Sequence, residues 1–232
     1  MQPETPLMAQ PGTATAPALA RNRVLRNTYM LLGLSMIPTV LGAWLGLQLK
    51  FTLFAGHPAM GMILFLAIAF GFMYGIQRTR NSGMGVALLL GFTFFMGLML
   101  SRMLGVILGL ANGAQLVGFA FGGTSIIFAT MATIATTTKR DLSGMGKFLL
   151  VGAVLLVLAM FANIFLQIPA LMIALSVLDI AIFSAFMLFD VNRIVTGGET
   201  NYVLATLALY LDLYNVFVNL LALLGMTSGS RD

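Results

Sequence analysis

Seven stretches of the chain are long and apolar, and short polar segments separate them. A helix needs about 20 mainly apolar residues to cross the ~30 Å hydrocarbon core of a bilayer. Measured against that length, the pattern predicts spanning helices at 27–49, 58–77, 83–103, 115–137, 146–167, 169–191 and 202–225. We therefore predict an all-α, polytopic membrane protein with seven transmembrane helices.

One of the breaks between these stretches is weaker than the others. Most breaks contain charged residues, as in QRTRNSG at 77–83 and NRIVTGGETN at 192–201. The break between the third and fourth stretches is marked mainly by Gly109, Asn112 and Gly113. Six spans and one re-entrant segment are therefore the alternative to seven spans.

The basic residues are distributed unevenly between the two sides of the predicted membrane domain. With a cytoplasmic N-terminus, nine lie on the cytoplasmic side and three on the other. The nine are Arg21, Arg23, Arg26, Arg78, Arg80, Lys139, Arg140, Lys147 and Arg193. This bias follows the positive-inside rule, so we predict a cytoplasmic N-terminus and a C-terminus on the opposite side.

The first twenty residues, MQPETPLMAQPGTATAPALA, differ from the rest of the chain. They lack the basic start and apolar stretch of a signal peptide, so we expect them to remain on the mature protein. Their composition predicts a disordered cytoplasmic tail at 1–20. Residues 21–232 form one seven-helix transmembrane domain, because no loop between the spans is long enough to fold separately.

The composition agrees with a membrane protein and excludes several kinds of site. Hydrophobic residues make up 59% of the chain and charged residues 8%, whereas soluble domains are about 25% charged. Cysteine is absent and His57 is the single histidine, which excludes thiolate and multi-histidine metal sites. The net charge of +5 reflects membrane topology rather than nucleic-acid binding.

Three aspartates, Asp179, Asp190 and Asp212, fall within predicted spans. A charged side chain at the centre of a membrane-spanning helix costs about 2.5–3.5 kcal/mol on insertion scales, so such residues usually mark function. Asp179 and Asp190 lie eleven residues apart, on one helix face and about 16 Å from each other. Asp212, Asn215 and Asn219 share one face of the next helix.

The short connection between the last two spans predicts that they are antiparallel neighbours. Asp190 and Asp212 can then meet if Asp190 lies deeper than the helix end that we place at 191. Two carboxylates in contact in a low dielectric share a proton, which would make a pH-responsive latch and an oxygen-rich Ca²⁺ site. The alternative is a structural role. In that case Asp212 and the two asparagines only form hydrogen bonds between helices, and the Asp190 side chain reaches the membrane surface. Asp179, Asn215 and Asn219 are candidates for pore-lining or helix-contact positions.

Several segments together resemble the Bax inhibitor 1 superfamily of seven-helix membrane proteins, and within it the bacterial YccA-like branch. They are VLRNTYMLL at 24–32, KRDLSGMG at 139–146, ANIFLQIPAL at 162–171 and LFDVNRIVTGGETNYVLATLALYLDLYNVFVNLLALLG at 188–225. The resemblance covers nearly everything after residue 20 and implies a Bax-inhibitor-1-like fold.

This resemblance implies two different activities. Relatives that are pH-sensitive calcium leaks pair the aspartates of an FD motif and an LYLD motif, which here are Asp190 and Asp212. In those relatives an arginine at the end of the second helix latches the first aspartate, and Arg78 and Arg80 are the candidates here. Many relatives also carry a glutamate in the second or third helix, and this sequence has none there.

The YccA-like branch implies instead an inner-membrane protein that modulates or inhibits the AAA protease FtsH through its cytoplasmic N-terminal tail. This is our first hypothesis, and a Ca²⁺ or proton leak gated by Asp190 and Asp212 is the alternative. In either case we expect a periplasmic C-terminus and no cofactor, with Ca²⁺ implied only as a transported or bound ion. We expect no enzyme: intramembrane aspartyl proteases carry Gly-x-Gly before their second aspartate, whereas Tyr210 and Leu211 precede Asp212.

Overall fold

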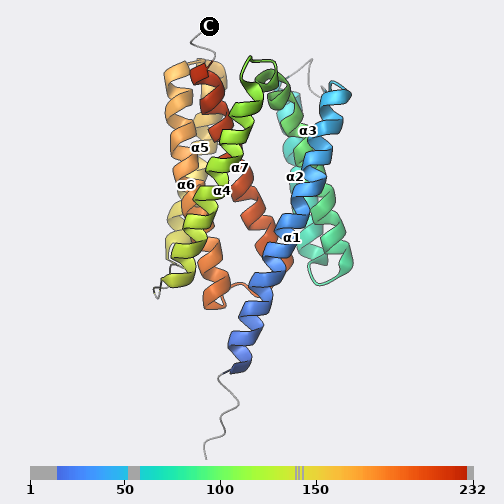
Figure 1. Cartoon of the computed structure of the whole chain (residues 1–232), viewed down its shortest axis with the longest axis vertical. Coiled ribbons are helices and arrows are strands. Elements are labelled where there is room, and N and C mark those ends of the chain that lie inside the picture. Colours follow the sequence, from blue (N-terminus) through green and yellow to red (C-terminus); the bar gives the residue numbers. More distant parts are fainter. Residues whose placement is uncertain (1–14, 52–57, 139, 141, 143, 229–232) are drawn as a thin grey trace, which may run out of the picture.

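The structure is a computed structural model, and it describes residues 15–51, 58–138, 140, 142 and 144–228. The regular elements of these residues are seven α-helices, all long and apolar enough to cross a membrane. They are α1 (Thr15–Gln48), α2 (Pro58–Thr79), α3 (Gly83–Leu108), α4 (Gly113–Thr137), α5 (Met145–Leu166), α6 (Pro169–Thr196) and α7 (Tyr202–Ser228). They form a bundle in which α1 begins at one end and α7 finishes at the other (Figure 1).

The weak break in the sequence is a true turn, so the prediction of seven spans is confirmed over six. Helix α3 ends at Leu108 and α4 begins at Gly113. A Cβ atom on Gly113 would lie 2.1 Å from the carbonyl oxygen of Ile107, so only glycine permits this close approach. The amide of Asn112 donates to Ser228 Oγ at 2.8 Å and ties the turn to the end of α7.

Two helix ends differ from the sequence prediction. Helix α1 begins at Thr15, so residues 15–20, which we expected in the tail, are helical, and residues 1–14 lie outside the described residues. Alanine and leucine dominate positions 16–20 and favour helix over coil. Helix α6 continues to Thr196, well past the predicted end at 191, and stops at Gly197, whose φ of +86° ends it in the left-handed conformation.

Helices α1 and α3 cross with their backbones in contact. A Cβ atom on Gly42 would lie 2.1 Å from the carbonyl oxygen of Phe94, and one on Gly97 would lie 2.1 Å from that of Thr39. Glycine makes this approach possible, as in other tightly packed membrane helices. Gly42 and Gly46 of α1 are four residues apart, as are Gly118 and Gly122 of α4, yet a Cβ atom on Gly118 or Gly122 would meet nothing within 4 Å.

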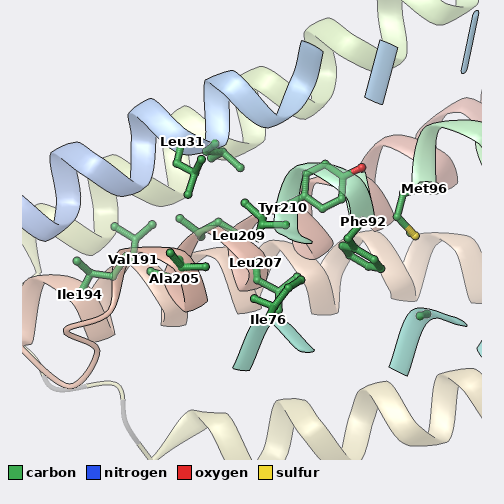
Figure 2. Close-up of a cluster of buried hydrophobic side chains, with 14 of the residues drawn as sticks. Leu31, Ile76, Phe92, Met96, Val191, Ile194, Ala205, Leu207, Leu209 and Tyr210 are labelled. Carbon is green, nitrogen blue, oxygen red and sulfur yellow. The ribbon is translucent and has the colours of Figure 1, made fainter. Parts of the chain in front are cut away.

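Helix α7 is central to the bundle, since it contacts α1, α2, α3, α4 and α6. Its fully buried Leu209 and Tyr210 lie in the main apolar cluster, together with Ile76 of α2 and Phe92 of α3 (Figure 2). The Tyr210 hydroxyl lies 3.0 Å from Thr39 Oγ1 of α1 and also donates to the carbonyl oxygen of Thr93 in α3, at 3.4 Å. This position of α7 places Asp212 in the interior of the protein.

Candidate functional site

The structure brings Asp190 of α6 and Asp212 of α7 together. Their carboxyl groups lie within hydrogen-bonding reach of each other. Both residues are buried, with 8% and 4% of their surfaces exposed. Within the described part of the chain, Asp212 Oδ2 is buried and no donor contacts it. An ionised carboxylate only accepts hydrogen bonds, so a bond between the two groups requires a proton on one of them.

The length of α6 explains why the two aspartates meet. Because the helix runs to Thr196, Asp190 lies about 9 Å inside its end rather than at the membrane surface. Helix α7 begins at Tyr202 and carries Asp212 about 15 Å along its axis. On these antiparallel neighbours the two positions therefore differ in depth by about one helical turn, a difference that the two side chains can span.

Arg193 is the cation beside this aspartate pair. Its Nη1 lies 3.5 Å from Asp190 Oδ1, and its Nη2 lies 3.5 Å from Glu199 Oε2. The guanidinium also lies over the ring of Phe189, 5.6 Å from its centre. Because 38% of the Arg193 side chain is exposed, solvent weakens both ion pairs. Arg193 thus links the buried pair to the connection between α6 and α7.

The two arginines that the resemblance suggested as a latch form no ion pair with Asp190 within the part of the chain that the structure describes. Arg78 and Arg80 are exposed near the end of α2, and both ion pairs found among the described residues belong to Arg193. Arg80 contacts the start of α7 only through its carbonyl oxygen, which accepts from Asn201 Nδ2 at 3.2 Å. The sequence signal for Arg193 was its spacing of three residues from Asp190 on one helix.

Two asparagines hold the connecting segments at this end of the bundle. Asn192 is buried; its Oδ1 accepts from the amide of Leu142 at 3.1 Å, and its Nδ2 donates to the carbonyl oxygen of Arg140 at 3.3 Å. Asn201 caps α7 by accepting from the amides of Val203 and Leu204. Its Nδ2 also donates to Asn81 Oδ1 at 2.8 Å. We did not anticipate either role, although an asparagine before a helix start is a known capping signal.

Asp179 lies apart from the aspartate pair. It is 4% exposed, and Asn219 Nδ2 donates to its Oδ2 at 2.5 Å. The eleven residues between Asp179 and Asp190 correspond to about 16 Å along α6. Asn215 donates to the carbonyl oxygen of Leu211 within its own helix, at 2.8 Å. The structure therefore joins Asp179 with Asn219, and this contact is an interhelical hydrogen bond.

The described residues contain no group of three or more histidine, cysteine, aspartate or glutamate side chains placed to hold a metal ion. The aspartate pair offers four carboxyl oxygens, whereas Ca²⁺ takes 6–8 oxygen ligands. A calcium ion at Asp190 and Asp212 would therefore need backbone carbonyl groups or water to complete its coordination.

These features define a class: a seven-helix membrane protein with a buried aspartate pair on its last two helices. Residues 21–229 match the family described as "Inhibitor of apoptosis-promoting Bax1". The chain belongs to this Bax inhibitor 1 family, as the resemblance in the sequence predicted.

Similarity to individual relatives extends over nearly the whole chain. The chain is 39% identical to the modulator of FtsH protease YccA of Escherichia coli K12, over 90% of this chain and 93% of that protein. It is also 39% identical to an uncharacterised protein of Neisseria meningitidis serogroup A, over 93% and 96% of the two chains. A relative in Escherichia coli O6:H1, again 39% identical over 90% of this chain and 93% of that protein, is named an inner membrane protein.

Proposed function

We propose that this protein modulates a membrane-bound AAA protease of the FtsH type from within the bacterial inner membrane. The observation that carries the proposal is the 39% identity, over 90% of this chain, to a protein named as a modulator of that protease. The similarity includes the whole bundle rather than one motif. The protein then acts by binding to the protease and not by a catalytic reaction of its own.

The N-terminal segment is the part of the chain that we propose the protease engages. Helix α1 extends past the ends of its neighbours at the end of the bundle where it begins (Figure 1). Its exposed arginines, Arg21, Arg23 and Arg26, favour the cytoplasmic side of the membrane. The segment before Thr15 would offer an AAA motor a chain end outside the membrane.

The proposed orientation gives a first prediction. A reporter fused before residue 1 should be cytoplasmic, and one fused after Asp232 should be periplasmic, because seven spans place the two ends on opposite sides. Alkaline phosphatase and green fluorescent protein fusions measure this, since the former is active only in the periplasm and the latter fluoresces only in the cytoplasm. Two ends on one side would contradict the proposed topology.

The tail provides the second prediction and tests the proposed function directly. Removal of residues 2–14 should slow degradation of the protein by the FtsH-type protease, because the motor loses its starting point while the helices stay intact. Pulse-chase half-lives in cells with active and inactive protease measure the effect. A glycine–serine segment of equal length in place of residues 2–14 is the control and should restore degradation.

The outcomes separate the mechanism from the function. If the shortened protein is degraded as fast as the full chain, engagement does not occur through the tail. If the full chain neither changes the activity of the protease nor is degraded by it, the proposed function is wrong.

A second candidate function is a pH-dependent leak for Ca²⁺ or protons through the membrane. The contact between the buried carboxyl groups of Asp190 and Asp212 favours it, because loss of their shared proton would place two negative charges side by side. Such a change could separate α6 from α7. The Asp212→Asn variant tests this function, as argued in the Discussion.

A further inference from the structure

A small cleft lies between the start of α1 and the end of α6, away from the aspartate pair. Its volume is about 140 Å³, and it is lined by Arg21, Asn22, Leu25 and Val195. Arg21 and Asn22 have side chains that donate hydrogen bonds, while Leu25 and Val195 are apolar and half-buried. The cleft therefore combines polar donors with an apolar wall.

Arg21 is held in position in this cleft. Its Nη1 donates to the carbonyl oxygen of Val195 at 3.1 Å, in the last turn of α6. Its side chain passes beside Gly197, where the chain leaves the helix. The hydrogen bond to Val195 uses one of the five N–H groups of the Arg21 guanidinium. The remaining N–H groups match phosphate oxygens in a bidentate geometry. A donor that is fixed before a ligand arrives loses less entropy on binding.

The surroundings of the cleft are basic. Arg23 and Arg26 are exposed on the same helix. Glu199, in the connection after α6, pairs with Arg193 at 3.5 Å and accepts from the backbone amides of Thr200 and Asn201. The C-terminal end of α6 carries a partial negative charge that would repel an anion. The positive charge of Arg21 offsets it.

The cleft lies at the depth of the lipid headgroups. Helix α6 has 28 residues, which corresponds to about 42 Å. A bilayer is ~40–45 Å thick with its headgroups and ~30 Å without them, so both ends of α6 reach the headgroup region. Val195 is the penultimate residue of the helix. A ligand in the cleft would therefore meet the membrane surface.

We propose that this cleft binds the phosphate group of an anionic phospholipid, such as phosphatidylglycerol. Arg21 and Asn22 donate to the phosphate oxygens, and Leu25 and Val195 contact the glycerol and the first methylene groups. Basic clefts between membrane helices on the cytoplasmic side bind such headgroups in other proteins. The bound lipid fixes the first turns of α1 to α6 at the membrane surface. This site is independent of the function proposed above.

The test measures lipid retained by the full chain in detergent, using native mass spectrometry with dioleoyl phosphatidylglycerol or dioleoyl phosphatidylcholine. The wild type should retain phosphatidylglycerol preferentially. Arg21→Gln should weaken this retention about tenfold or more, the usual effect of losing a charge-assisted hydrogen bond. Arg23→Gln is the matched control, since it removes an equal charge from the same helix outside the cleft.

A second variant tests the site independently, in case Arg21→Gln does not fold. Val195→Phe keeps every charge and the carbonyl oxygen but fills the cleft, so it should also reduce retention of phosphatidylglycerol. Inorganic phosphate at millimolar concentration should not displace the lipid; if it does, the ligand is free phosphate and the lipid proposal is wrong. Equal losses in Arg21→Gln and Arg23→Gln, or no loss in Val195→Phe, would also overturn the site.

Discussion

Gly97→Ala should lower the free energy of unfolding by about 3 kcal/mol or more, the upper range for overpacking a close contact. The added Cβ atom would lie 2.1 Å from the carbonyl oxygen of Thr39 and 3.0 Å from the backbone nitrogen of Ala43. Both atoms belong to the backbone of α1, so no side-chain rotation relieves the overlap. Thermal unfolding of the purified protein in detergent, followed by intrinsic fluorescence, measures the change.

Gly118→Ala is the matched control for this variant. A Cβ atom on Gly118 meets nothing within 4 Å, and alanine is favoured over glycine within a helix by about 0.5–1 kcal/mol. This variant should therefore be as stable as the wild type or slightly more stable. Similar losses of stability in both variants would show that the crossing of α1 and α3 does not depend on backbone contact.

Asp212→Asn should abolish any pH dependence in the separation of α6 from α7. In the wild type, we expect a proton shared by Asp190 and Asp212 to hold the helices together at acidic pH. Its loss leaves two negative charges in contact, so the helices should separate as the pH rises. An asparagine at 212 donates a hydrogen bond to Asp190 at every pH, so the closed arrangement should persist.

Two measurements follow this behaviour between about pH 5 and about pH 8, a range that shared protons in buried carboxyl pairs can reach. One is the distance between spin labels on α6 and α7, which attach only at introduced positions because the chain has no cysteine. The other is Ca²⁺ flux into proteoliposomes. Asp179→Asn is the control and should keep the wild-type response, since Asp179 bonds to Asn219 and not to the pair.

Other outcomes would contradict the pH-dependent separation or the leak. If the wild type shows no pH-dependent separation, or Asp212→Asn retains it, the two aspartates serve only as polar contacts between helices. A separation without Ca²⁺ flux would support a pH-responsive pair while contradicting the leak.

The seven spans, and the presence of aspartates within them, could be predicted from the sequence because both signals are local. Hydropathy reports each helix by itself, and a carboxylate within an apolar stretch is conspicuous wherever it lies. The end of α6 could not be predicted in this way. The polarity of Asn192 and Arg193 suggested an end at 191, but the helix continues until Gly197 permits the left-handed turn.

The partners of the aspartates depend on tertiary structure, and this limits what sequence could predict. Arg193 pairs with Asp190 through their spacing of three residues on one helix, whereas only the packing of the helices brings Asp212 to Asp190 and Asn219 to Asp179. The same holds for Asn192, whose two partners lie about fifty residues earlier in the chain. Likewise, the spacing of Gly42 and Gly46 cannot be distinguished from that of Gly118 and Gly122 until their surroundings are known.

The backbone contact between α1 and α3 has a mechanical consequence for the proposed function. A motor that pulls on the N-terminal segment applies its force to α1 before any other helix. That helix cannot slide past α3 while Gly97 is seated against the carbonyl oxygen of Thr39, and Thr39 is also bonded to Tyr210 of α7. The pulling force is therefore distributed over α1, α3 and α7 as soon as the motor begins to pull. Resistance of this kind would keep the protease occupied with a chain that it extracts only slowly.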